Sequence, residues 1–372
     1  DAVRSNDITA YFLNAGKFAF KMPALVNSEN SVTAYVGAEK TSTKEKKVYG
    51  KKEATKAVQP APVEEVAEED AEAEEEEAEE AAEAEATAVT TVGPDDAAGV
   101  LATLDLAHSL FILVSKSGTT LETLTNESFV KDALKNAGLD ASKHMIAVTS
   151  ETSPLAKSAD YLSAFFMDDY IGGRYSSTSA VGGAVLSLAF GPEVFEAFLN
   201  GAAEQDQLSK NKDVLKNPAL LDALIGVYER NVLGYPTTAV LPYSQALSRF
   251  PAHLQQLDME SNGKSVNRFG EAVNCQTGPI IFGEPGTNGQ HSFYQLLHQG
   301  TDIVPLQFVG FKSNQMGRDV VIQDSTSQQK LCANVVAQIV AFACGKDNED
   351  RNKYFEGGRP SSIIIGDKLD PK

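Results

Sequence analysis

The sequence predicts an α/β protein with parallel sheets covered by helices on both faces. Short apolar runs, such as residues 109–115 (SLFILVS), are typical of buried strands. Amphipathic stretches with helical spacing alternate with these runs from about residue 89 onward. Strands that alternate with helices form βαβ units, which place the strands parallel. The chain has 372 residues, enough for two domains that each bury a core.

The elements follow in a regular order. Apolar runs predict strands at residues 109–115, 145–150, 237–243, 279–283, 304–311 and 361–365. The stretches between them predict helices at residues 121–134, 154–159, 177–189, 192–207, 218–233, 251–261, 291–299 and 325–344.

Residues 1–88 have a different composition. Residues 7–20 are compatible with one helix. Residues 40–56 hold seven lysines against two acids, and residues 64–85 hold 14 acids and no base. Charged sequence that is poor in aromatic residues buries too little apolar area to offset the cost of ordering its backbone. We therefore expect a largely disordered charged arm over residues 1–88.

Charge and cysteine content exclude several classes of protein. The formal net charge is −19, of which the run at 64–85 carries −14, so a basic surface for nucleic acid is excluded. Three cysteines (Cys275, Cys332 and Cys344) suit neither a disulfide framework nor a zinc site. No apolar stretch is long enough to span a bilayer. We expect a cytoplasmic protein with no membrane or nucleic-acid partner and no metal.

The first candidate site is SKSGTTLET at residues 115–123, which follows a strand and precedes a helix. Its hydroxyls and the free amides of the helix start could bind one anion, such as a phosphate. Alternatively, Thr119 and Glu122 form a capping box and the hydroxyls only cap the helix. The expected anion-binding residues are Ser115, Lys116, Ser117, Gly118, Thr119 and Thr120.

Two further candidates carry charged or amide side chains. In DDYIGGRYSS (residues 168–177), two glycines allow a tight turn that places Arg174 before a helix, although this sequence by itself is more typical of a surface arginine. On a helix over 251–261, His253, Gln256 and Glu260 share one face. That face offers a base, an amide and an imidazole, but a solvated polar face has the same pattern.

The fourth candidate is the loop FGEPGTNGQHSF at residues 282–293. Its turn-forming residues follow a strand, at the end where α/β sheets commonly bind ligands. His291 is expected at the start of the next helix, where the helix dipole disfavours a protonated imidazole.

With SKSGTTLET, IGGRYS, DMESNGKS and GEPGTNGQH in this order, the chain from residue 89 to 372 resembles the glucose-6-phosphate isomerase family. The resemblance implies two sugar-isomerase (SIS) domains, each a three-layer αβα unit, here 89–234 and 235–372. It also implies a homodimer, glucose 6-phosphate and fructose 6-phosphate as substrates in glycolysis and gluconeogenesis, and no cofactor.

The resemblance assigns roles residue by residue. Glu260 matches the base that moves a proton between carbons 1 and 2 through an enediolate, and Arg174 matches the arginine that steadies the negative charge of that intermediate. His291 matches the ring-opening residue, which the neighbouring subunit lends in this family. Gln256 matches a substrate-contacting glutamine, and residues 115–120 match the phosphate loop. His253 stands where the family usually has an aromatic ring and is not counted as catalytic.

The sequence also departs from the family pattern. A glycine-rich turn expected upstream of the phosphate loop is replaced by residues 1–88, and the chain stops at Lys372 before a motif with a catalytic lysine. Both expected SIS domains are therefore incomplete. Two hypotheses remain: an aldose-ketose isomerase, or a catalytically incomplete fragment that binds sugar phosphates.

Overall fold

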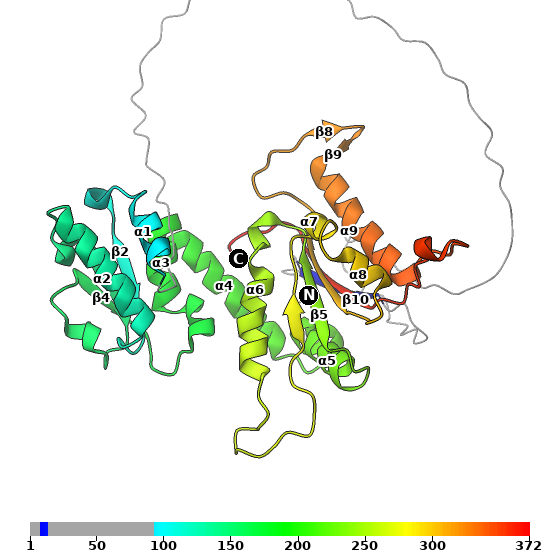
Figure 1. The fold of residues 1–372 in the computed structure, drawn as a ribbon, viewed down its shortest axis with the longest axis horizontal. Coiled ribbons are helices and arrows are strands. Elements are labelled where there is room, and N and C mark those ends of the chain that lie inside the picture. The colour runs from blue at the N-terminus through cyan, green and yellow to red at the C-terminus, as the bar shows by residue number, and fades with distance from the viewer. Residues whose placement is uncertain (1–7, 14–92) are drawn as a thin grey trace, which may run out of the picture. The chain divides into compact units, whose positions relative to one another are not determined.

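The computed structural model describes residues 8–13 and 93–372 and confirms the predicted α/β class (Figure 1). The Lys-rich block and the acidic run, which we expect to be a disordered arm, lie outside the described residues. Most described strands belong to two sheets, one of three strands and one of five. The division into domains at residues 234 and 235 remains a prediction.

Two strands of the three-stranded sheet lie within predicted strands. Its parallel strands are β2 (Phe111–Val114), β3 (Met145–Thr149) and β4 (Ser163–Phe166), in that spatial order. The helices of this region are α1 (Pro94–Leu101), α2 (Leu121–Asn136), α3 (Ala180–Phe190) and α4 (Pro192–Ser209). The predictions missed β4, whose short SAFF run becomes a strand only through its pairing with β3, and they missed α1.

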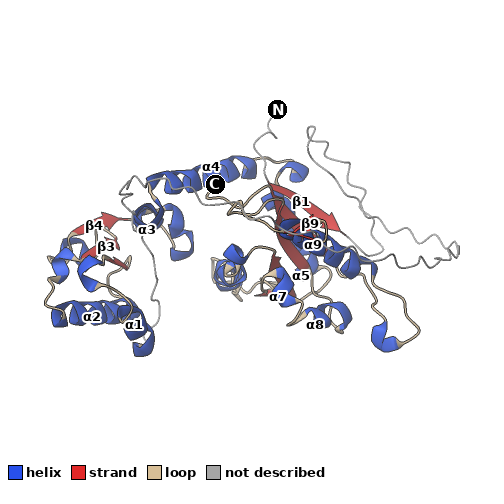
Figure 2. Ribbon diagram, turned by 90° about the horizontal axis from the view of Figure 1, so that it is seen from above, coloured by secondary structure: helices blue, strands red, loops and turns tan. Residues whose placement is uncertain are grey.

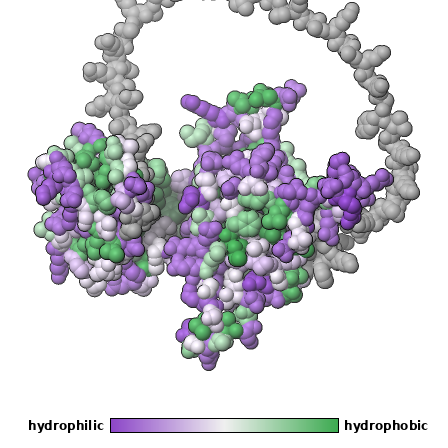
Figure 3. Space-filling view, in the orientation of Figure 1, coloured by the Kyte–Doolittle hydropathy of each residue, from purple (hydrophilic) through white to green (hydrophobic). Residues whose placement is uncertain are grey.

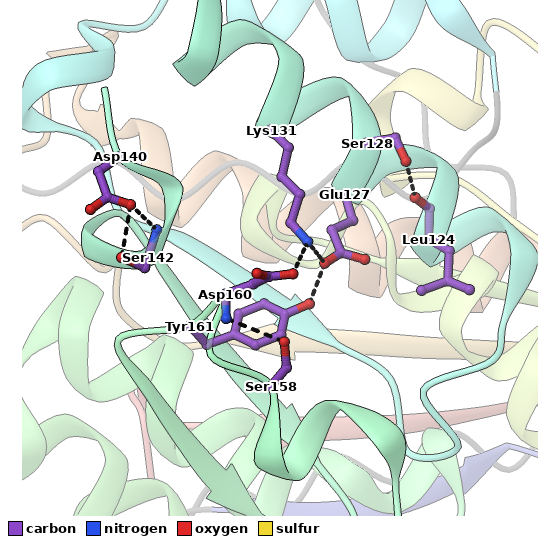
Figure 4. Close-up of polar contacts among 9 residues, drawn as sticks. All are labelled: Leu124, Glu127, Ser128, Lys131, Asp140, Ser142, Ser158, Asp160 and Tyr161. Atoms are coloured by element: carbon purple, nitrogen blue, oxygen red, sulfur yellow. Dashed lines mark hydrogen bonds and ion pairs between the residues drawn. The ribbon is translucent and has the colours of Figure 1, made fainter. Parts of the chain in front are cut away.

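A polar network around a buried glutamate ties α2 to the segment before β4 (Figure 4). Glu127 on α2 is only 8% exposed. It pairs with Lys131 at 2.7 Å and accepts a hydrogen bond from the Tyr161 hydroxyl, while Lys131 also pairs with Asp160 at 2.7 Å. Burial and the neighbouring Glu127 raise the pKa of Tyr161, so its hydroxyl remains a donor.

The five-stranded sheet has the order β1-β10-β7-β5-β6. Its parallel strands are β5 (Thr237–Pro242), β6 (Ile280–Phe282), β7 (Leu306–Phe311) and β10 (Ser361–Gly366). β1 (Ile8–Leu13) pairs antiparallel with β10 at the sheet edge. The expected helix over 7–20 is therefore wrong at residues 8–13: β-branched and aromatic residues suit a strand, and the open edge of β10 supplies the partner.

Helices cover the five-stranded sheet on both faces (Figure 2). They are α5 (Pro218–Asn231), α6 (Phe250–Leu254), α7 (Gly286–Gly289), α8 (Tyr294–Gln299) and α9 (Ser327–Cys344). On one face, Phe308 of β7 packs in a core with α8 and α9 residues such as Leu297 and Phe342. On the other face, Gln307 donates a 2.9 Å hydrogen bond to Asp222 of α5.

Several predicted helices differ in type or bounds. The helix expected over 154–159 is a short 3₁₀ segment (Pro154–Lys157). The helix expected over 325–344 begins at Ser327, because Thr326 caps it in a capping box with Gln329, and a short strand pair, β8 (Val321–Ile322) and β9 (Ser325–Thr326), precedes it. The helix expected over 177–189 begins at Ala180 after a 3₁₀ segment (Gly173–Thr178). The helix expected over 251–261 is α-helical only to Leu254.

Two further observations concern the cysteines and the surface. All three cysteines are unpaired. None of the helices in the described part is both long and apolar enough to cross a bilayer.

Apolar side chains lie among polar ones on the face drawn in Figure 3. In the three-stranded sheet, Phe165 and Phe166 of β4 are each 46% exposed, so this edge strand leaves apolar surface uncovered.

Glu229 on α5 should make the stability of the fold depend on pH. Burial, with a contribution from Asp222, raises its pKa to about 7. The folded chain keeps this proton at pH values where the unfolded chain, with a pKa of about 4.3, has lost it. The stabilisation is full below about pH 4 and is lost as the pH rises through about 7.

Glu229→Gln should therefore raise the free energy of unfolding at pH 8, by on the order of 1 to 3 kcal/mol. The gain should be clearly smaller at pH 5, where part of the cost of ionisation is absent. Urea unfolding at both pH values measures this. Glu356→Gln, which changes an exposed carboxylate, is the control and should have no such effect. An equal gain at both pH values would contradict a raised pKa.

Candidate functional site

Glycine determines the shape of the loop that follows β2. Gly118 has a φ of +66°, and a Cβ added there would lie 2.3 Å from the Ser153 hydroxyl oxygen. The amide of Gly118 donates to the hydroxyl of buried Ser115 at 3.1 Å. The chain thus turns tightly between β2 and α2, and only glycine fits the turn without strain.

The hydroxyls of this loop do not cap α2. The residue before α2 is Thr120, and no side chain there makes a capping hydrogen bond. The capping box of Thr119 with Glu122 is therefore wrong: Thr119 is instead hydrogen-bonded to the Ser117 hydroxyl through both its amide (3.2 Å) and its side chain (3.0 Å). The first-turn amides of a 16-residue helix and three exposed hydroxyl-bearing residues remain at one place, which suits an anion.

The ammonium group of Lys116 binds a second loop, the one that follows β4. Its Nζ donates to the backbone carbonyls of Asp169 and Ile171, each at 2.9 Å. Both residues lie between β4 and Arg174. Sequence reasoning does not anticipate these acceptors, because every residue type carries a backbone carbonyl.

Arg174 reaches the helical segment that carries Glu260. Its Nη1 donates to the Gln256 carbonyl at 2.6 Å and to the Ser261 hydroxyl at 2.8 Å. Its Nη2 pairs with Glu260 Oε1 at 2.7 Å, with exposed side-chain fractions of 20% for Arg174 and 58% for Glu260. The structure therefore brings together three predicted site residues from two motifs. Ser261, which the predictions missed, belongs to the same DMESNGKS motif.

The arginine controls the charge of Glu260. Its hydrogen bond and positive charge hold the pKa of Glu260 below the ordinary value, and Gln256 and Lys264 add smaller contributions. Glu260 is therefore ionised at neutral pH, which is the form that can accept a proton. The ammonium of Lys264, a second residue that the predictions missed, also donates to the carbonyls of Glu260 and Ser261.

A π-helix carries these side chains. Residues Gln255–Glu260 form it directly after α6, in place of the predicted continuous α-helix. The i to i+5 pattern has more residues per turn, so the α-helical spacing of His253 and Glu260 does not apply across it. Gln256 and Glu260 remain in contact, whereas His253 on α6 is exposed and stacks on Phe250. π-helical turns are frequent at functional sites.

His291 lies apart from these contacts. It is exposed in the turn between α7 and α8, and α8 begins only at Tyr294, so the expected position at a helix start is wrong. The preceding residues already form α7, and the His291 amide donates to the Asn288 carbonyl at 3.0 Å. Among the described residues, no hydrogen bond or ion pair joins the His291 side chain to the rest of the site.

The described residues include no group of three or more His, Cys, Asp or Glu side chains placed to hold a metal ion. The chemistry that the arrangement itself offers is proton transfer by a carboxylate beside a guanidinium, and the loop after β2 presents hydroxyls and free amides that suit an anion.

Comparisons with known proteins point to one family. The family model described as phosphoglucose isomerase matches residues 70–372, which extends 19 residues further toward the N-terminus than the resemblance in the sequence. A glucose-6-phosphate isomerase from Treponema denticola is 68% identical over 284 residues, which is 76% of this chain and 54% of that protein. One from Treponema pallidum is 66% identical over the same length.

Solved structures agree. The crystal structure of a glucose-6-phosphate isomerase from Chlamydia trachomatis has a TM-score of 0.75 and 53% identity, covering 76% of this chain and 54% of that one. A hypothetical protein from Thermus thermophilus has a TM-score of 0.61 at 28% identity, covering 75% and 65%. The chain spans about half the length of the curated relatives it matches.

The turn at Gly118 should tolerate no side chain. Gly118→Ala should lower the free energy of unfolding by about 2 to 4 kcal/mol, because a left-handed backbone and an overlap with Ser153 both add cost. Gly138→Ala is the matched control: it has a φ of +72° but open space, so it should cost only about 1 to 2 kcal/mol. Equal losses in urea unfolding would show that Ser153 leaves room for a methyl group.

Proposed function

The chain belongs to the phosphoglucose isomerase family, and on that premise we propose that it carries the proton-transfer centre and phosphate loop of an enzyme that interconverts glucose 6-phosphate and fructose 6-phosphate. This step belongs to glycolysis and gluconeogenesis. The observation that carries the proposal is the Arg174–Glu260 ion pair, which joins the family's IGGRYS and DMESNGKS motifs at 2.7 Å.

Glu260 acts as the base in this proposal. Its carboxylate takes the proton from carbon 2 of the open-chain aldose, and the electron pair of that bond forms the enediolate. The same group then returns the proton to carbon 1, while the hydroxyl proton on the oxygen of carbon 2 is lost and the oxygen of carbon 1 gains a proton, both by exchange with solvent, which gives the ketose. No electrons leave the substrate, so the step requires no redox cofactor. The depressed pKa of Glu260 keeps the base ionised before each turnover.

Arg174 stabilises the negative charge of the intermediate, and Gln256 contacts the substrate. The guanidinium that pairs with Glu260 in the free protein is placed to stabilise the enediolate oxygens once the carboxylate has accepted the proton. A positive group positioned before the reaction stabilises developing charge without reorganising. Gln256, which helps to lower the pKa of Glu260, contacts the substrate in this proposal.

The loop after β2 holds the phosphate. Exposed hydroxyls at Ser117, Thr119 and Thr120 and the free amides at the start of α2 form an anion site of the type found at helix N-termini. The buried hydroxyl of Ser115 and the turn at Gly118 hold the loop in shape. Phosphate recognition is thereby separated from the reacting carbons.

His291 opens the sugar ring in this proposal and is lent by the neighbouring subunit of a homodimer. Its exposure on a turn, without a hydrogen bond to the rest of the site among described residues, supports a role toward a second copy.

A second candidate has one observation in its favour. Among the described residues, no hydrogen bond or ion pair joins the His291 side chain to Arg174 or Glu260, which is compatible with a protein that binds sugar phosphates but does not catalyse the reaction. A coupled assay of fructose 6-phosphate formation, run beside calorimetric titration with the same substrate, separates the two. Turnover supports the isomerase, and binding without turnover supports the second candidate.

Removing hydroxyls from the phosphate loop should weaken substrate binding. Thr120→Val with Ser117→Val should raise KM for fructose 6-phosphate at least about tenfold with little change in kcat, because hydrogen bonds to a charged group are lost. Thr125→Val is the control, since its hydroxyl donates only to the Leu121 carbonyl within α2. An unchanged KM would show that the phosphate binds elsewhere.

Glu260→Gln tests the base. The amide keeps the size of the carboxylate but accepts no proton, so kcat should fall at least about a hundredfold while KM changes little. The direct measurement is exchange of the carbon 2 proton of glucose 6-phosphate with deuterated solvent. Glu349→Gln, at an exposed carboxylate after α9, should exchange at the parental rate. Parental exchange by Glu260→Gln would assign the base to another residue.

A further inference from the structure

The side chain of Lys116 joins the phosphate loop to the loop that carries Arg174. Its ammonium donates to the carbonyls of Asp169 and Ile171 at 2.9 Å each, across more than 50 residues of sequence. The Ile171 amide in turn donates to the Asp168 carbonyl at 3.1 Å, which closes a turn. The two acceptor carbonyls are therefore held as one unit by a single cation.

The chain between this turn and Arg174 is short and hydrogen-bonded. Gly172 and Gly173 are the only residues between Ile171 and Arg174, and Gly173 already begins the 3₁₀ segment that carries Arg174. The Tyr175 amide donates to the Gly172 carbonyl at 3.0 Å, which ties the start of that segment to its first turn. A displacement of the 168–171 turn is therefore passed on to the backbone of Arg174.

The ammonium has only three donors, and the two carbonyls take two of them. A lysine committed in this way is poorly placed to act mainly as a phosphate ligand. The phosphate loop has other donors for that purpose, namely its hydroxyls and the amides at the start of α2.

We propose that Lys116 is a positioning residue. When a ligand orders the phosphate loop, the Lys116 ammonium also orders the 168–171 turn, and that turn positions Arg174. The inference rests on the proposed function and deepens it: binding of the phosphate then aligns the guanidinium with the reacting carbons. A substrate without phosphate would be turned over slowly even when it occupies the same site.

The kinetic test replaces the ammonium and keeps the length of the side chain. In the longest form of the protein that the gene encodes, Lys116→Met should lower kcat about 10- to 100-fold, since small misplacement of a catalytic group has that effect, with KM within about threefold of the parent. Lys116→Arg should restore most of kcat, because a guanidinium can also donate to two carbonyls. Lys143→Met, an exposed lysine before β3 at the opposite edge of the sheet, is the control.

A double-mutant cycle identifies the residue through which Lys116 acts. In an Arg174→Ala background, Lys116→Met should lower kcat by less than about twofold, because the group that it positions is already absent. A full additional loss there would overturn the proposal. A raised KM with unchanged kcat in the single variant would also overturn it and assign the ammonium to the phosphate.

Hydrogen exchange tests the link that Lys116 makes between the two loops, called the tether below, independently of catalysis. Inorganic phosphate, used as the probe, should slow exchange of the amides at 171–174 in the parent protein but not in Lys116→Met, with equal circular dichroism spectra as the folding check. If the parent shows no such protection, the proposal fails even if the protein is an active isomerase. If protection appears but no isomerase activity is found, the proposed function fails and the tether stands.

Discussion

The contact on which the candidate site depends is that of the Arg174 guanidinium with the helical segment 256–261. One guanidinium donates to a backbone carbonyl, a hydroxyl and a carboxylate of that segment. Because Glu260 is largely exposed, the ion pair adds little to the stability of the fold. Its effect is on orientation and on the charge of Glu260, which are the properties that proton transfer requires.

Parallel strand order explains why the polar loops meet. The loop after β2 and the segment after β4 both leave the carboxyl edge of the same three-stranded sheet. Gly118 lets the first loop turn against Ser153, and Lys116 then reaches the second. The candidate anion loop and the placement of Arg174 thus depend on one sheet edge, although Arg174 contacts a helical segment more than 80 residues further along the chain.

The five-stranded sheet and its helices form a rigid support for the helical segment that carries Glu260. α8 and α9 close one face of the five-stranded sheet around Phe308, and α5 closes the other. In sequence, the π-helical turn of Gln255–Glu260 comes between β5 and β6. The Gln255 side chain donates to the Ile281 carbonyl of β6 at 3.0 Å. A helix held to the sheet in this way can present Glu260 to solvent without fraying.

The sequence by itself determined the α/β class, most strands and helices and the motifs that show the family, because apolar periodicity and contiguous motifs are local properties of the chain. Only the tertiary structure decided that residues 8–13 form a strand, since β10 supplies their partner. It also decided that the helix before Glu260 contains a π-turn, that His291 lies in a turn, and that Lys116 holds the carbonyls of a distant loop. Those outcomes depend on backbone groups that are the same in every residue, so their partners are selected only when the folded chain brings them together.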